Sequence, residues 1–145
     1  MKRHFCILIA LLFTAISANA HPLGNFTINQ YSRLEVEKSQ IKIRQILDIA
    51  EIPSFQLKSE IDTYKKREFS DDELNAFAEN ITPQILANLS LAVNEKPLEI
   101  RAESKNIFLQ NGEGNLPTIK IEWNLTSGLI NADAVNRVSF ENKNY

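Results

Sequence analysis

Apolar and polar residues alternate along much of the chain, with the period of two that is typical of half-buried β-strands. The first alternating run covers residues 26–37 and has its apolar residues at even positions, whereas the second, over 41–49, has them at odd positions. Three polar residues separate the two runs, which predicts an antiparallel hairpin. Gln30 and Ser32 interrupt the apolar row of the first run, and we expect a bend there.

Helical spacing replaces this alternation at Pro53, which we expect to end the second strand because proline has no N–H for a β-ladder. A short, weak helix is predicted directly after it. Ser70 followed by Glu73 is a capping-box pattern and predicts the start of a second helix. Pro83 is expected to end or kink that helix. We therefore predict a helical insert over about residues 54–88.

The alternation returns after the insert and predicts five further short strands. They cover residues 90–94, 98–103, 107–109, 119–125 and 138–140. Turn signals separate them, the clearest being the glycine-containing stretch 111–115. Short strands with turns at this spacing are typical of a β-sandwich. We predict a mostly β fold, an antiparallel β-sandwich of about seven strands with a short helical insert between strands 2 and 3.

The start of the chain has the pattern of a secretory signal peptide. Two basic residues precede an apolar run over 5–16, and Ala18-Asn19-Ala20 supplies the small-x-small pattern that signal peptidase accepts. The run is short for a membrane span, and no later stretch is apolar enough for one; the alternative is a retained N-terminal anchor. We predict a signal peptide over 1–20 and one exported domain, periplasmic or extracellular, over 21–145.

Removal of the signal peptide changes the charge of the chain. The mature chain would have 125 of the 145 residues, and two of the 16 basic residues would be lost, so that 14 basic residues face 18 acidic ones, a net charge of −4. This acidic balance argues against nucleic acid as a partner. Cys6, the only cysteine, would leave as well, so we expect no disulfide within the mature chain and a stability that rests on an apolar core.

His21 would be the first residue of the mature chain and is the first candidate metal ligand. Its α-amine and imidazole Nδ1 can close a chelate ring on one ion, and imidazole suits Cu, Ni and Zn. Pro22 has no amide proton, so its nitrogen cannot join a square-planar amide site, and a copper brace would need a second histidine. Any metal would take further ligands from elsewhere in the chain or from another protein. The alternative is that His21 only marks the cleavage site.

Asp48 and Glu51 are the two acidic residues in and beside the second predicted strand. Asp48 shares its face with Lys42 and Arg44, so a solvated or ion-paired position is the ordinary explanation. Glu51 falls at the strand end, on the parity of the apolar row, and is a candidate ligand or a cap on nearby backbone amides. The two acids are poorly placed as a general acid/base pair because their parities put them on opposite faces.

Residues 62–73 have the length of a calcium loop, with Asp62 at position one and Glu73 at position twelve. Position five is Lys66 and position six is Arg67, where such a loop needs an oxygen ligand and a glycine. We expect no calcium binding. An ordinary capped surface helix is the alternative reading of this segment.

Two motifs resemble a known family. They are His21-Pro22-Leu23-Gly24-Asn25-Phe26-Thr27, followed by Tyr31-Ser32-Arg33, and Leu47-Asp48-Ile49-Ala50-Glu51-Ile52-Pro53-Ser54-Phe55-Gln56. Together they resemble the exported N-terminal domain of bacterial nickel/cobalt-exporter-like membrane proteins, and residues 136–145 are similar to the last strand of that domain. The resemblance covers nearly all of the mature chain.

The chain also departs from this family. The domain there precedes a multi-helix transport region, which this sequence does not have, so the resemblance implies no transport by this chain. The calcium-like loop of the family has lost its key ligands here. The chain stops at Tyr145, where members of the family continue, and we expect a truncated product, a split gene or a fragment.

These observations favour a non-enzymatic exported domain that binds or senses a divalent transition metal, Ni, Co or Cu, near His21. Glu51 and Asp48 are the further candidate ligands, and a membrane metal transporter or another envelope protein is the expected partner. The alternative is a structural or protein-interaction module whose sheet edge docks on a partner, with no metal role. We expect no enzymatic activity, because the mature chain has no Cys–His pair, no phosphate loop and no serine nucleophile elbow.

Overall fold

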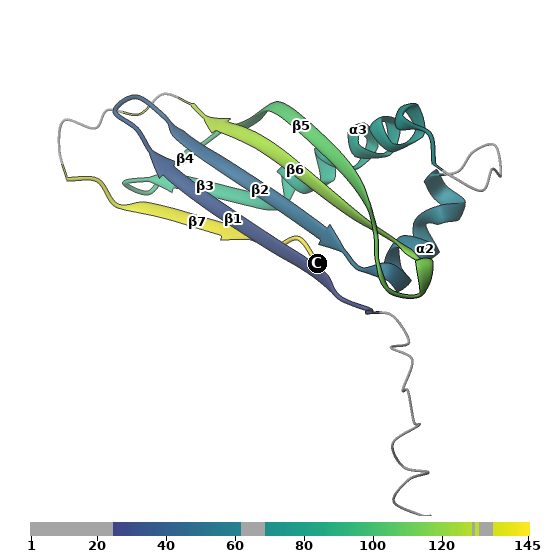
Figure 1. Cartoon of the computed structure of the whole chain (residues 1–145). Coiled ribbons are helices and arrows are strands. Elements are labelled where there is room, and N and C mark those ends of the chain that lie inside the picture. Colours follow the sequence, from purple (N-terminus) through teal and green to yellow (C-terminus); the bar gives the residue numbers. More distant parts are fainter. Residues whose placement is uncertain (1–24, 62–68, 129, 131–134) are drawn as a thin grey trace, which may run out of the picture.

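Seven strands form two antiparallel sheets in the computed structural model, which describes residues 25–61, 69–128, 130 and 135–145 (Figure 1). The larger sheet has the order β1-β2-β6-β5, with β1 at Ile28–Val36, β2 at Ile41–Ile49, β6 at Pro117–Ser127 and β5 at Ile100–Asn111. The smaller sheet has the order β4-β3-β7, with β4 at Lys96–Leu98, β3 at Leu89–Val93 and β7 at Val138–Asn142. This arrangement confirms the predicted antiparallel β-sandwich.

Two helices lie between β2 and β3, which confirms the predicted insert: α2 at Glu51–Ile61 and α3 at Asp71–Ala87. Pro53 does not end the strand. It lies in the first turn of α2, where a missing N–H costs nothing because the first turn has no internal acceptor. Figure 1 shows both helices at the end of the large sheet where β2 stops and the β5–β6 turn lies. The turn itself contains a short 3₁₀ helix, η1, at Glu113–Asn115.

The capping box predicted at the start of α3 is present. The Ser70 hydroxyl accepts from the Glu73 backbone N–H, and the Glu73 carboxylate accepts from the Ser70 N–H at 2.9 Å. Pro83 lies inside α3 and does not end it, since the helix continues to Ala87. Pro83 is exposed, so the carbonyl that it leaves without an amide partner can bond to water.

The core lies between the inner face of the large sheet and the layer formed by the small sheet and α3. Its most deeply buried side chains come from β2 and β6: Ile41, Ile43, Leu47, Ile49, Ile119, Ile121, Trp123 and Leu125. α3 packs against Trp123, whose indole N–H donates to Thr82 Oγ1 at 2.8 Å. Thr82 Oγ1 in turn donates to the Ala78 carbonyl at 2.6 Å, so the buried indole has the partner that it needs.

β5 is one long strand where the sequence pattern predicted two short ones, over 98–103 and 107–109. A β-bulge causes the difference: Ala102 pairs with Leu125 and Ser104 pairs with the adjacent Asn124, so one extra residue lies between them. Because of the extra residue, the inward-facing side chains change from even-numbered to odd-numbered positions. In the sequence alone, this change of parity looks like the end of one strand and the start of another. A separate short strand, β4, precedes β5 and follows a two-residue turn at Asn94 and Glu95, both of which have positive φ.

A polar cluster lies inside the sandwich, against the inner face of β1. Gln45 is 0 % exposed, and its Oε1 accepts from Ser32 Oγ at 2.5 Å and from Asn142 Nδ2 at 3.4 Å. Asn142 Nδ2 also donates to Gln30 Oε1 at 3.0 Å. β1 pairs with β2 without a register shift from Ile28 to Val36, so these hydrogen bonds, rather than a break in pairing, account for polar residues on the inner row.

The same cluster connects the end of β7 to α3. Asn144 Nδ2 donates to the Ile85 carbonyl at 3.1 Å, and Asn88 Nδ2 donates to Asn144 Oδ1 at 3.2 Å. The side-chain amide of Gln30 donates to the Asn144 carbonyl. The segment that follows β7 is therefore tied to both β1 and the C-terminal end of α3.

Candidate functional site

The described residues begin at Asn25, and His21 lies outside them. Asn25, the first described residue, is held against α2, because its backbone N–H donates to Glu51 Oε2 at 3.1 Å. The Ile52 N–H donates to the Asn25 carbonyl at 3.1 Å, which extends the pairing of β1 up to the start of α2.

Glu51 is the first residue of α2 and is only 7 % exposed. While Oε2 accepts from Asn25, Oε1 accepts from the backbone N–H of Glu113 at 3.0 Å. The carboxylate therefore binds one amide that precedes β1 and another that follows β5. The sequence suggests two roles for Glu51, a metal ligand or a cap on backbone amides. Its two hydrogen bonds are those of a cap on backbone amides. We call this arrangement of Glu51, Asn25, Gly112 and Glu113 the carboxylate clamp.

Gly112 lets the β5–β6 turn approach Glu51. A Cβ at position 112 would lie 2.4 Å from Glu51 Oε1 and 2.6 Å from its Cγ, which is closer than atoms can pack. Gly112 has φ −98°, a value that any residue can adopt, so the requirement for glycine here is space. Gly114, by contrast, has φ +65° and open space around it, so its requirement is conformational.

The clamp holds Glu51 in its charged form. The backbone N–H of Glu113 is the main cause that lowers the pKa of Glu51, followed by the N–H groups of Glu51 itself and of Asn25, while burial acts in the opposite direction. Charge-assisted hydrogen bonds of this kind are stronger than those between neutral groups. A carboxylate at the first turn also interacts favourably with the dipole of α2.

Asp48 lies apart from the clamp, on the outer face of β2. It is exposed, and its neighbours across the sheet are Asn29 of β1 and Lys120 of β6. This matches the solvated position that the sequence indicated. The two acidic residues therefore have different environments. Asp48 faces solvent beside Lys120, whereas Glu51 is buried and accepts hydrogen bonds from backbone amides.

Within the described part of the chain, no group of three or more His, Cys, Asp and Glu side chains could hold a metal ion. Residues 62–68 of the calcium-like loop lie outside that part. Glu73, its last position, is buried and takes part in the capping box of α3.

The outer face of the large sheet carries paired charges. Arg44 Nε and Nη2 donate to the two oxygens of Glu122, both at 2.7 Å, which raises the pKa of Arg44 and lowers that of Glu122. A shallow concavity of about 330 Å³ beside this pair is lined by Glu35, Lys42, Arg44 and Glu103 among others. Both of its basic residues already have carboxylate partners, so we assign it no ligand.

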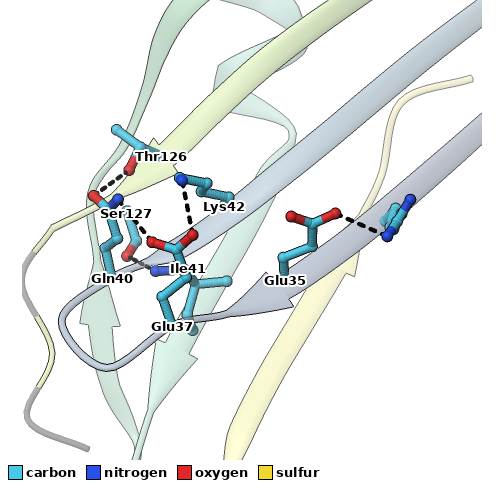
Figure 2. A network of polar contacts seen from close by, with 8 residues as sticks. Glu35, Glu37, Gln40, Ile41, Lys42, Thr126 and Ser127 are labelled. Carbon is cyan, nitrogen blue, oxygen red and sulfur yellow. Dashed lines mark hydrogen bonds and ion pairs between the residues drawn. The ribbon is translucent and has the colours of Figure 1, made fainter.

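A second polar network closes the β1–β2 turn, at the end of the sheet opposite the helices. The Glu37 carboxylate accepts from Lys42 Nζ at 2.7 Å and from Gln40 Nε2 at 3.2 Å. Figure 2 shows these contacts across the turn. The Ile41 N–H donates to Ser127 Oγ at 2.8 Å, which binds the turn to β6 (Figure 2). These bonds keep the last residues of β1 in register with β2.

β1 pairs with β2 and, along the described residues, with no other strand. The bonds from the Ala50 N–H to the Thr27 carbonyl and from the Glu37 N–H to the Gln40 carbonyl show that odd residues point their backbone groups toward β2. The even residues from Ile28 to Val36 therefore point their backbone N–H and C=O groups away from β2. β7 lies below this side, bonded through Asn142, but its backbone pairs with β3. We call this row of N–H and C=O groups the β1 edge.

β5 is the opposite edge of the same sheet and has more protection. The bulge interrupts it, and Lys105 points its side chain to the inner face, where it forms an ion pair with Glu79 of α3. α3 packs beside this strand. Bulges and inward charges are the usual means by which sheet edges avoid pairing with other chains.

The sequence alone does not identify β1 as an edge strand. Its only local signal is a long alternating strand with no bulge or proline, and a central strand has the same pattern.

Comparison of the chain with models of protein families, with curated proteins and with solved structures finds no match. No helix in the described residues is long and apolar enough to cross a membrane.

Proposed function

We propose that this chain is a non-enzymatic exported domain that acts as an interaction module of an envelope assembly. It docks by accepting an extended strand, which supplies backbone N–H and C=O groups, on the β1 edge. The observation that carries this proposal is the unbroken nine-residue pairing of β1 with β2, while no other strand of the described residues pairs with the opposite side of β1. Strand addition of this kind obtains affinity from main-chain hydrogen bonds and specificity from side chains at alternate positions.

Exposed apolar side chains along β1 support the proposal. Tyr31 is 53 % exposed on its outer face and Val36 is 60 % exposed at its end. The carboxylate clamp and the β1–β2 turn network hold the two ends of β1, so the acceptor edge is already in its extended form. A preformed edge lowers the entropy cost of adding a strand.

Photo-crosslinking in the producing cell tests the proposal. A benzophenone amino acid at Tyr31 should crosslink to a protein, and the Val36→Pro substitution in the same chain should abolish that product. Proline removes an N–H that points away from β2, so the β1–β2 pairing is kept. The matched control is the same probe at Phe108, which is exposed on the outer face of β5. Equal products from both positions, or a Tyr31 product that persists with proline at 36, would contradict docking at the β1 edge.

Binding of a divalent transition metal near His21 is the second candidate function. The observation in its favour is that the clamp fixes Asn25, four residues after His21, beside a buried carboxylate. Both Glu51 oxygens already accept backbone N–H groups, so the ion would need other ligands as well. Calorimetric titration of the cleaved protein with Ni²⁺, Co²⁺, Cu²⁺ and Zn²⁺, beside His21→Ala, tests this role. Equal binding by both proteins, or none by either, would exclude it.

A further inference from the structure

We infer that the strand accepted by the β1 edge is β1 of a second copy of this chain, so that two copies form one continuous eight-stranded sheet about a two-fold axis. This inference rests on the proposed docking function and names its partner. An isologous contact of this kind requires a surface that is complementary to itself. The residues of β1 have that property.

Backbone geometry limits the possible registers. Only the even residues of β1 point their N–H and C=O groups outward, so an antiparallel pair of β1 strands must place even residues opposite even residues. The register centred on Ser32 does so and pairs all nine residues of both strands. Ile28 then lies opposite Val36, Gln30 opposite Leu34, and the pairs exchange about ten backbone hydrogen bonds.

Outer-face side chains favour the same register. Tyr31 would lie opposite Arg33 of the other copy, twice, in reach of a cation–π contact. Asn29 would lie opposite Glu35. A register centred on Arg33 would instead place two guanidinium groups opposite each other, which is unfavourable. Within one chain Arg33 and Glu35 form an ion pair at 3.0 Å with both side chains about half exposed, so both are available at the surface.

The contact would also cover apolar surface that one copy leaves in solvent. Val36 and Tyr31 are the two most exposed large apolar residues within β1, and this register gives each an opposing side chain. Two paired strands form a small interface, and small interfaces belong to weak, reversible complexes. We expect a dissociation constant of about 10–100 µM, within the range of weak association.

Sedimentation velocity from about 5 to 500 µM tests the inference on the exported chain. We expect a monomer–dimer equilibrium for the wild-type chain and a dissociation constant raised at least tenfold by Val36→Pro. The matched control is Leu109→Pro, which removes an outward N–H from the β5 edge and should leave the equilibrium unchanged. Circular dichroism and the melting temperature of both variants check that the fold is kept.

Disulfide trapping tests the register. In a Cys6→Ser background, a mixture of Tyr31→Cys and Arg33→Cys chains should form mixed disulfides faster than either chain alone. A preference for Arg33→Cys with Glu35→Cys would contradict the register centred on Ser32.

The outcomes separate the two proposals. A wild-type chain that stays monomeric up to 500 µM overturns self-pairing and leaves the photo-crosslinking test of a different partner standing. A dimer that Val36→Pro does not weaken places the contact elsewhere and overturns self-pairing at the β1 edge. A dimer lost with Leu109→Pro instead would assign the contact to β5 and contradict both proposals.

Discussion

β1 and β5 are the two edges of one sheet, and they meet solvent in different ways. β5 has a bulge, an inward lysine that pairs with Glu79, and a helix beside it. β1 has nine residues in unbroken register, and its charged residues Arg33 and Glu35 lie on the outer face rather than toward the core. Natural sheets protect edges that must stay unpaired. The difference therefore indicates which edge is available to another strand.

The inner faces of the two edge strands are covered by different parts of the molecule. Side chains of α3 cover the inner side of β5, whereas β1 lies over a cluster of amides from Gln45, Asn142 and Gln30. The carboxylate clamp joins the two regions, since Glu51 binds the residue that precedes β1 and the turn that follows β5. Substitutions in β5 or in the amide cluster should therefore affect one edge, whereas substitutions in the carboxylate clamp should affect both.

The largest effect should come from removing the protection of β5. Deletion of Glu103 together with Lys105→Leu should give β5 regular pairing with β6 and an apolar inner row, because Ala102 and Ser104 already pair with adjacent residues of β6. A chain with two open edges can pair at both, so we expect assemblies larger than dimers in sedimentation velocity. A variant that sediments like the wild-type chain would show that the bulge and the lysine do not protect this edge.

The next largest effect should come from the support of β1. Asn142→Ala removes the donor to Gln30 and Gln45 and leaves the amide of Gln45 buried with fewer partners. We expect a loss of about 2 kcal/mol in the free energy of unfolding, measured with urea. Asn124→Ala is the matched control, because Asn124 is exposed and bonds only to Ser104 among the contacts described. Equal losses for both variants would contradict a special role for the buried cluster.

A smaller effect is expected at the clamp. Gly112→Ala places a methyl group against the Glu51 carboxylate, which must move and release the N–H groups of Asn25 and Glu113. We expect the melting temperature to fall by a few degrees and hydrogen exchange at those two amides to accelerate. Gly128→Ala, which meets no atom within 4 Å, should behave like the wild-type chain. Unchanged exchange at Asn25 would show that the clamp does not hold the start of β1.

Sequence and structure agree best where the signal is local. The capping box needs only Ser70 and Glu73, three positions apart, and the alternation around Trp123 reports a central strand. The bulge in β5 could not be read from the pattern, because a change of parity after Ala102 is equally consistent with a strand end. The sequence marks Glu51 as a candidate site residue, but its partners Asn25 and Glu113 lie 26 and 62 residues away, and only the fold brings them together. The sheet order that makes β1 an edge is likewise a property of the whole chain.

The smallest expected effect is the pH dependence of the clamp. The pKa of folded Glu51 lies below its ordinary value of 4.5, so its contribution to stability is complete above about pH 4.5 and is lost as the pH falls through the folded pKa. Glu51→Gln removes this contribution at all pH values, so the stabilities of the two proteins should converge on acidification. Urea titrations between pH 3 and 7 measure the difference. A gap that stays constant over this range would contradict a charged clamp.

The hydrogen bond between Gln30 and Asn142 joins residues 112 positions apart. Synthesis of the chain from its N-terminus therefore exposes β1 and β2 long before their partner Asn142 is made. Because contacts between distant positions slow folding, we expect the polar inner face of β1 to stay hydrated until β7 docks. We therefore expect the chain to reach its folded form only after β7 has been synthesised, with the amide cluster as the step that completes folding.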